Sequence, residues 1–406
     1  MSEIKLINKD EDCCACGACM NICPKSAISM KANDFGYLYP EIDKLKCIEC
    51  GLCVRTCAYQ NKEKQGCNPN VVYALTSKNN DFVSKSASGG VFAQLASFFI
   101  ENNGVVYGVA FDENDIKNGA KHISVNNLKD LYRLQGSKYV QSNIGMTMKA
   151  VKNDLDAGLK VLFSGSPCQV AGLKSFLKKD YDNLYTVDVI CHGVPSQRFF
   201  SDFLTHSEKK IKGKITDFSF RDKSKGQGMI ARVKYTDKNG IEKEICKKGQ
   251  LFSYFYLFLF GVTYRENCYS CPYAKKERFS DMTIGDYWGF NNIFDKNNVP
   301  DGMTDEKGIS CALINTEKGS ELFNSCKDSF IFLESSYEDV SKMNGQLKYP
   351  SKKNPYRERF FKVYAQSGYE GVERLYFKVF KKDILKYSIA DSMPRNLKNI
   401  IHKISK

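Results

Sequence analysis

Short apolar runs alternate with amphipathic segments through the middle of the chain. Three of the runs are rich in β-branched and aromatic residues, which favour strands. They are VVYALTS at 71–77, GVVYGVAFD at 104–112 and YTVDVICHGVP at 185–195. Residues 84–102 begin with serine and glycine and continue with an apolar stripe at helical spacing, made by Val91, Leu95, Phe98 and Phe99. Strands that alternate with helices predict an α/β core with helices packed on a sheet.

The same order recurs at residues 160–177, which predict a strand, a Ser/Gly/Pro turn and a helix. Hairpin-like sequence follows at 214–225 and 229–245, where Asn239-Gly240 is a tight-turn signal. We therefore predict a β-rich insertion after the α/β part. The longest apolar run, LFSYFYLFLF at 251–260, is about half as long as a membrane-spanning helix. It predicts a buried helix or strand.

The first ten residues, MSEIKLINKD, contain no apolar stretch of the kind found in secretory signals. We therefore expect a soluble, cytoplasmic protein without a transmembrane segment. The chain has 17 cysteines in 406 residues. In a reducing compartment, so many thiols favour metal or redox chemistry over structural disulfides.

Eight of the first ten cysteines form two copies of one spacing, C-x2-C-x2-C-x3-C. The first copy is Cys13, Cys16, Cys19 and Cys23, and the second is Cys47, Cys50, Cys53 and Cys57. This is the bacterial ferredoxin spacing, in which the fourth cysteine ligates the other cluster. The spacing predicts that Cys57 joins the first three cysteines in cluster 1. Cys23 then joins Cys47, Cys50 and Cys53 in cluster 2.

Details of the two copies support this interpretation. Gly17 and Gly51 occupy matching places where the backbone must turn close to the cluster. Pro24 follows the first copy, whereas Ala58 takes that place in the second. A pair of zinc sites is the alternative, but zinc sites usually use C-x2-C pairs separated by a longer gap. Cys14 fits neither spacing, so we predict that it is not a ligand.

A polar segment at 61–70 predicts a linker to the larger part of the chain. In that part, Cys168 and Cys191 follow predicted strands, where ligand sites gather in open α/β sheets. Cys268 and Cys271 form a C-x2-C pair. The four cysteines are candidates for a third metal site. The alternative is that they are small buried residues, as free cysteines often are.

Several motifs in order resemble the beta-subunit family of coenzyme F420 hydrogenases and dehydrogenases. They are SASGGVF, LQGSKYVQS, SGSPCQVAGLKSFL, DVICHGVPS and CYSCPYA followed by SDMTIGDYWG. The resemblance covers about residues 1–335 and implies a flavoprotein that exchanges electrons between 4Fe-4S clusters and a two-electron carrier, often F420. It also implies a third 4Fe-4S cluster, because members without the ferredoxin head still carry one.

The flavin that the resemblance implies has candidate contacts in three turns. Ser86, Ser88, Gly89 and Gly90 open a predicted helix whose free amides suit a phosphate. The other candidates are Lys138, Ser164, Gly165 and Ser166. A short Gly/Ser turn by itself is usually just a helix cap. The resemblance favours FAD over FMN.

No catalytic acid or base is predicted, because the flavin carries the hydride chemistry. His192 is a candidate proton donor, although a hydrogen-bonded turn histidine is the simpler interpretation. Trp288 is expected to anchor the core and Asp286 to bond its own turn. No GxGxxG stretch favours NAD(P).

The net charge is +14, and residues 351–406 hold 14 Lys/Arg against 5 Asp/Glu. This amphipathic tail predicts a solvated basic helix face, with an acidic redox partner as the alternative. No nucleic-acid-binding motif is present. The expected partner is therefore a redox protein or a small electron carrier.

The expected fold class is α+β or α/β. A ferredoxin-type domain with two 4Fe-4S clusters is expected at 1–66. A flavin domain with a β-rich insertion is expected at 67–335, in parts of about 71–150 and 151–335, and a basic helical tail at 336–406. The function predicted is an iron–sulfur flavoprotein oxidoreductase. An electron-transfer subunit without a substrate site is the first alternative, and a protein with structural or sensing clusters is the second.

Overall fold

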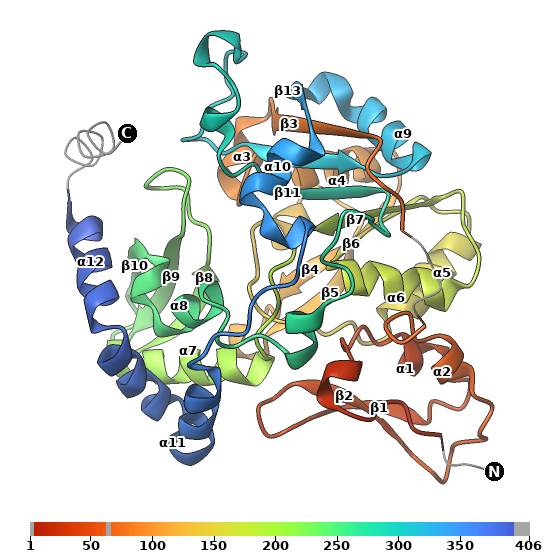
Figure 1. Ribbon diagram of the computed structural model, residues 1–406, viewed down its shortest axis with the longest axis horizontal. Coiled ribbons are helices and arrows are strands. Elements are labelled where there is room, and N and C mark those ends of the chain that lie inside the picture. Colours follow the sequence, from red (N-terminus) through yellow and green to blue (C-terminus); the bar gives the residue numbers. More distant parts are fainter. Residues whose placement is uncertain (1–3, 62–65, 394–406) are drawn as a thin grey trace.

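The computed structural model describes residues 4–61 and 66–393, and its largest element is a mixed sheet of eight strands (Figure 1). The strand order is β13-β3-β12-β11-β7-β6-β4-β5. The bounds are β3 Val71–Ser77, β4 Val105–Phe111, β5 Ala120–Val125, β6 Val161–Gly165, β7 Leu184–Val189, β11 Met282–Asp286, β12 Ser310–Ile314 and β13 Phe330–Ser335. The four central strands β11, β7, β6 and β4 are parallel, and the outer pairings are antiparallel.

Helices cover both faces of this sheet, because successive side chains of each strand point to opposite faces. Val106 and Leu162 pack with α4 (Val91–Glu101) and α9 (Glu317–Cys326). Their neighbours Tyr107 and Phe163 pack instead with α5 (Thr147–Asp156) and α6 (Pro167–Leu177). The α10 helix (Tyr337–Met343) lies on this second face under the outer strands. The predicted α/β core is confirmed as three layers.

The helix predicted over 84–102 is shorter in the structure. A short helix, α3 (Asn80–Lys85), ends first, and α4 begins only after the turn at 86–90. Gly90 has a φ of +79°, a left-handed conformation that interrupts the helix. The turn therefore stands as a separate feature at the carboxyl end of β3.

The predicted β-rich insertion is a three-stranded antiparallel sheet with its own aromatic core. Its strands are β8 (Gly213–Ser219), β9 (Ile230–Asp237) and β10 (Glu242–Lys248). The helices α7 (Gln197–Ile211) and α8 (Ser253–Leu259) pack against it, and α8 contains the apolar run expected to be buried.

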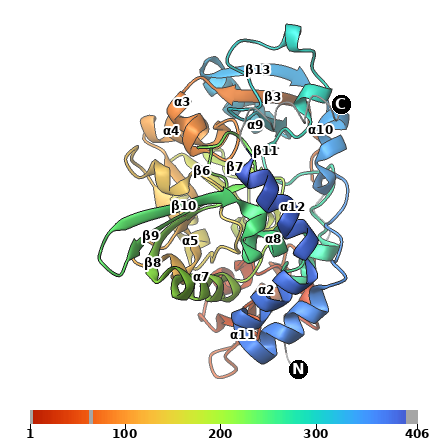
Figure 2. The same cartoon turned by 90° about the vertical axis from the view of Figure 1, so that its left-hand side faces the viewer.

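The C-terminal segment packs on this insertion. The α11 helix (Arg357–Val379) buries Phe360, Tyr369 and Tyr376 in the aromatic core, and α12 (Lys381–Ser392) runs along β10. Figure 2 shows both helices beside the insertion. The basic side chains face solvent: Arg359, Lys362, Arg374, Lys378, Lys381, Lys382 and Lys386. Residues 394–406 of the predicted tail lie outside the described part of the chain.

The N-terminal segment is a small module of two short helices and one hairpin. The helices are α1 (Ala18–Ile22) and α2 (Leu52–Arg55), and β1 (Ile28–Ala32) pairs antiparallel with β2 (Leu38–Ile42). The module lies against α5 and α6 of the core (Figure 1). Among the described residues, no helix is long and apolar enough to cross a membrane.

The buried side chain of His122 connects β5 to β6 and to the loop that contains Ser142. The Nε2 of His122 lies 3.2 Å from the carbonyl oxygen of Ser164, and its Nδ1 lies 3.2 Å from the hydroxyl of Ser142. Gln169 in turn donates to that hydroxyl at 2.9 Å. In this arrangement Nε2–H donates and Nδ1 accepts, which requires a neutral ring. Burial lowers the pKa of His122 to about 4.

We predict that His122 makes the folded state sensitive to mild acid. The unfolded state takes up the proton below its ordinary pKa of 6.5, whereas the folded state resists it down to about pH 4. Stability therefore falls as the pH drops through this window, by about 2 kcal/mol from pH 7 to pH 5. His122→Gln should lack this component, which denaturant unfolding of both proteins at the two pH values measures. An equal loss in both proteins would contradict the assignment.

Candidate functional site

The two cysteine loops of the N-terminal module have the same backbone conformation. Gly17 and Gly51 have φ values of +77° and +69°. Ala15 and Glu49, two residues before them, both have a φ of +54°, which is uncommon for residues with a Cβ and typical of functional turns. Their amides donate to the sulfurs of Cys13 and Cys47 at 3.3 and 3.4 Å. The sequence indicated the glycines but not the strain at these two residues.

The fourth cysteine of each copy lies near thiols of the other copy: Cys57 lies near Cys16 and Cys19, and Cys23 lies near Cys53, although Cys57 also lies near Cys53 of its own copy. Burial raises the pKa of Cys19 well above its ordinary value, and the charges of Cys16, Cys13 and Cys57 raise it further. Burial also raises the pKa of Cys53, where Cys50 and Cys23 are the charged neighbours. Cys57 therefore lies near the first loop and Cys23 near the second.

In the described residues, no group of three or more His, Cys, Asp or Glu side chains is arranged around a single metal ion. In a 4Fe-4S cluster each thiolate binds a different iron, so cluster ligands need not converge on one point.

The two groups differ in their surroundings. Cys16 is 8% exposed and packs with residues of α5 and α6. Cys50 is exposed, and Leu45, Ile48 and Val54 beside the second loop are exposed as well. Cluster 1 would therefore face the core, and cluster 2 would lie toward solvent.

Close backbone contacts hold the first loop on the core. A Cβ built on Gly172 of α6 would lie only 2.8 Å from the Cys16 sulfur, so a glycine is needed there. Gln141 donates to the carbonyl of Cys14 at 3.2 Å, and Arg265 donates to that of Cys13 at 2.8 Å. These contacts fix the position of the loop relative to the sheet.

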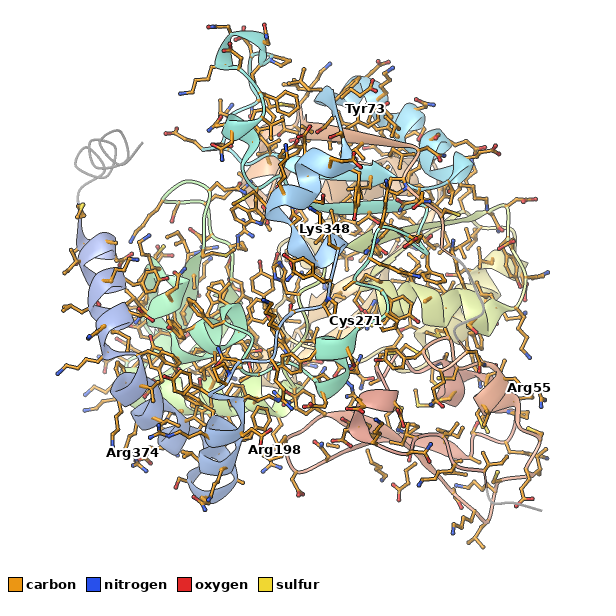
Figure 3. The ribbon with its side chains drawn as sticks, viewed as in Figure 1. Arg55, Tyr73, Arg198, Cys271, Lys348 and Arg374 are labelled. Atoms are coloured by element: carbon orange, nitrogen blue, oxygen red, sulfur yellow. The ribbon has the colours of Figure 1, made fainter. Side chains whose placement is uncertain are left out.

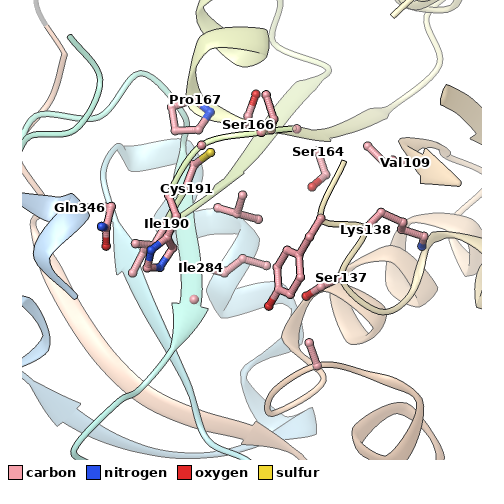
Figure 4. Close-up of a pocket in the computed structure, with 18 of the residues that line it drawn as sticks. Val109, Ser137, Lys138, Ser164, Ser166, Pro167, Ile190, Cys191, Ile284 and Gln346 are labelled. Carbon is pink, nitrogen blue, oxygen red and sulfur yellow. The ribbon is translucent and has the colours of Figure 1, made fainter. Parts of the chain in front are cut away.

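A cavity of about 360 Å³ opens at the carboxyl ends of the parallel strands, next to this loop (Figure 4). It brings together seven of the eight residues predicted to hold the flavin: Ser86, Ser88, Gly90, Lys138, Ser164, Gly165 and Ser166. The cavity also contains Cys168, Cys191, Cys268 and Cys271. Figure 3 labels Cys271 near the middle of the molecule and Arg55 at its edge.

Gly89 does not line the cavity. Its amide donates to the Ser310 hydroxyl at 2.9 Å, and a Cβ there would lie 2.5 Å from the Leu75 carbonyl oxygen. The hydroxyl of Ser88 donates to the Ile309 carbonyl at 2.8 Å. These two residues fasten the turn to the sheet, and Gly90, Val91 and Phe92 at the start of α4 line the cavity.

Lys138 lines the cavity, but its amine is already engaged. The Nζ atom donates to the carbonyl oxygens of Arg133 and Gln135 at 2.8 and 2.6 Å. Burial lowers its pKa to about 7. Lys138 therefore shapes its own loop in this conformation.

The four core cysteines are half-buried and share the cavity wall with a fifth thiol, Cys14. Cys14 is 5% exposed and lines the cavity. A hydrogen bond from its thiol, followed by one from Ser166, lowers the pKa of Cys168 to about 7. Burial raises the pKa of Cys268 to about 12 and that of Cys271 to about 11. Cys14, which fits neither spacing in the sequence, thus links the first loop to the core thiols.

Arg221 and Asp286 form a second polar group at the cavity. The guanidinium donates to both carboxylate oxygens, at 2.7 and 3.0 Å, and lies 5.3 Å from the ring centre of Trp288. Asp286 was expected to bond its own turn, and here it pairs with a distant arginine. No sequence signal marked Arg221. His192 also lines the cavity, and burial lowers its pKa.

Comparison with known proteins supports the recognition made from the motifs. Residues 158–339 match the family model that describes the C terminus of the coenzyme F420 hydrogenase/dehydrogenase beta subunit. Residues 12–61 match the model described as 4Fe-4S dicluster domain, so the prediction of iron–sulfur clusters in this segment is confirmed. No curated protein matches the chain.

A solved structure of the F420-reducing [NiFe] hydrogenase complex from Methanosarcina barkeri contains a similar chain. The two chains are 15% identical, and the match covers 75% of this chain and 89% of that chain, with a TM-score of 0.42. This level of likeness carries no argument about function. In this chain, a segment similar to the 4Fe-4S dicluster domain is thus followed by a segment similar to the C terminus of the coenzyme F420 hydrogenase/dehydrogenase beta subunit.

Proposed function

We propose that this protein is an iron–sulfur flavoprotein oxidoreductase. Electrons would pass between its 4Fe-4S clusters and a flavin, FAD as the resemblance implies, and on to a two-electron carrier such as F420 or NAD(P)H or to a ferredoxin-linked acceptor. One observation carries the proposal: the same cavity joins the cluster 1 loop, four core cysteines and the glycine/serine turns at the strand ends. We also propose that the domains meet after residues 66 and 335, as the sequence predicts.

The chemistry of the cavity wall fits a third 4Fe-4S cluster. Cys168, Cys191, Cys268 and Cys271 would be its ligands. Three buried donor atoms near them have no hydrogen-bond partner: Arg265 Nη1, Arg265 Nη2 and the Tyr273 hydroxyl. Unsatisfied buried donors are costly, and an anionic cluster would supply the missing acceptors.

The part of the cavity lined by the glycine/serine turns fits a flavin. The volume of the whole cavity lies within the range of small-molecule pockets, and two helices begin at the cavity wall. The amides after Gly90 and Ser166 are suited to phosphate oxygens. When bound, a flavin accepts one or two electrons and so connects cluster chemistry to hydride chemistry. The chain itself would bind and orient it in the same cavity as the core cysteines.

The burial of the thiols suggests an order for the redox centres. The loop of Cys47 and Cys50 lies toward solvent, whereas the loop of Cys13 and Cys16 contacts the core. Electrons would therefore exchange with a partner at cluster 2 and reach the flavin through cluster 1 and the core cluster. A redox protein or small carrier is the expected partner. The exposed basic side chains of α11 and α12 suit an acidic partner at a different surface, because Arg374 of α11 and Arg55 of α2 lie at opposite edges of the molecule (Figure 3).

A subunit that only transfers electrons within a hydrogenase- or dehydrogenase-like complex is the second candidate. The family match favours it, because that family model is named for a beta subunit.

Anaerobic reconstitution with iron, sulfide and FAD or FMN tests the proposal. Three 4Fe-4S clusters hold twelve iron atoms and two hold eight, so the iron count shows whether the core cluster is present. Visible flavin absorbance shows whether a flavin is bound. A screen of reduced carriers then distinguishes the oxidoreductase from the electron-transfer subunit. Flavin reduction without a second subunit supports the oxidoreductase, and its absence with every carrier supports the transfer subunit. Eight irons and no flavin would refute the proposal.

Two cysteine variants test the ligand assignment. Cys168→Ala should reduce the iron content from twelve to eight atoms per chain, because a core ligand is lost. Cys14→Ala, its matched control, removes a neighbouring buried thiol and should keep twelve. Iron and sulfide analysis of the reconstituted proteins provides the measurement. A loss of four irons in the Cys14 variant would instead make Cys14 a ligand.

A glycine pair tests the flavin site. Gly90→Ala places a Cβ 3.1 Å from the Val83 amide nitrogen, so the turn at the cavity must shift. Flavin affinity should fall at least tenfold. Gly158→Ala is the control, because Gly158 has a φ of +82° and open space around its Cα. Each left-handed alanine costs about 1–2 kcal/mol of stability. Equal flavin affinity in both variants, measured by flavin fluorescence titration, would exclude this turn from the site.

A further inference from the structure

Arg265 differs from the other deeply buried arginines of the described chain. Arg278 pairs with Asp188 at 3.0 Å, Arg221 with Asp286 at 2.7 Å and Arg357 with Glu266 at 3.1 Å. The Arg265 side chain is 0% exposed and pairs with no carboxylate among the residues that the structure describes.

The contacts of Arg265 leave one side of its guanidinium free. Its Nε donates to the Cys13 carbonyl at 2.8 Å, and the planar group lies 4.1 Å from the ring centre of Tyr39. Nη1 and Nη2 have no hydrogen-bond partner. An uncompensated buried charge is strongly destabilising. The surroundings therefore lack an anion that the working protein would contain.

Arg265 lies close to the cysteines of two predicted clusters. The residue precedes the Cys268–Cys271 pair by three positions, and its amide donates to the Val194 carbonyl at 2.9 Å. It lines the cavity with Cys168 and Cys268. The hydrogen bond from its Nε to the Cys13 carbonyl places the same cation beside the cluster 1 loop.

We infer that Arg265 is the counter-charge shared by cluster 1 and the core cysteine site, and that it raises the reduction potential of cluster 1. Reduction adds one electron to a cluster, and a nearby buried cation stabilises the more negative product. Arg265 is a positioning and tuning residue, since it acts through the clusters. The part concerning the core site rests on the proposed function, whereas the part concerning cluster 1 needs only the dicluster domain.

The test is an anaerobic redox titration of the reconstituted full chain, followed by electron paramagnetic resonance. Arg265→Met keeps the length of the side chain and removes its charge. It should shift the reduction equilibrium of cluster 1 at least tenfold toward the oxidised form, which is 59 mV for a one-electron couple. Cluster 2 should not move and serves as the internal reference. Cys50→Ala removes a predicted cluster 2 ligand and identifies the two signals.

Two variants separate charge from burial. Arg265→Lys keeps the charge and should shift cluster 1 less than threefold. Arg357→Met removes a buried arginine that has its own carboxylate, and should shift neither cluster. Loss of cluster 1 iron in Arg265→Met alone, with full iron in Arg265→Lys, would support the inference because the charge is then required for assembly.

An unchanged cluster 1 potential in Arg265→Met overturns the inference. So does a loss of iron in the methionine and lysine variants alike, because the charge is then not what the cluster needs. Failure of the proposed function gives a different result. If the wild-type protein holds eight irons, the core cluster is absent. The reduction potential of cluster 1 in Arg265→Met still tests the role of Arg265.

Discussion

The close packing of the Cys13–Cys19 loop on helix α6 places the chemistry of this protein in one region. Gly172 allows the Cys16 sulfur to approach the helix, and Asn21 fixes the same loop by donating to the carbonyl oxygens of Gly17 and Gly145 at 3.0 and 2.8 Å. A displacement of the loop would separate it from the cavity at the strand ends. The electron path that we propose from the small module to the large domain therefore depends on this contact.

The concentration of thiols at that contact has an electrostatic cost. Burial disfavours thiolates, yet cluster ligands must be deprotonated. The structure offsets this with donors from several distant segments: the Cys14 thiol, the Ser166 hydroxyl and Arg265. These groups come from the N-terminal loop, the start of α6 and the turn before Cys268. The site is thus an assembly of both domains.

The aromatic insertion and the C-terminal helices pack together around one aromatic core beside the main sheet. The α11 helix fills the core of the insertion with Phe360, Tyr364 and Tyr376, and its basic side chains other than Arg357 lie in solvent. Arg221, two residues after β8, extends from this insertion to Asp286 at the end of β11 in the main sheet. The insertion therefore contributes Arg221 to the cavity wall.

Local patterns in the sequence determined the fold class and much of the chemistry. Strand and helix periodicity predicted the layered core and the insertion, because side-chain burial repeats every second or every three to four residues. The cysteine spacing predicted the dicluster domain, because cluster geometry fixes short-range ligand intervals. Serine and glycine at strand ends indicated the cavity, since such residues open helices there.

Only the tertiary structure decided how these parts meet. Cys14 fits neither spacing and becomes significant only beside Cys168, which is more than a hundred residues away. Gly89 and Lys138 share the predicted motifs, but their hydrogen bonds go to the sheet and to their own loop. No sequence motif marked Arg265. Its lack of a carboxylate partner among the described residues is visible only in the three-dimensional structure. Long-range contacts and burial are not encoded by local spacing, and they determine which of the candidate residues act together.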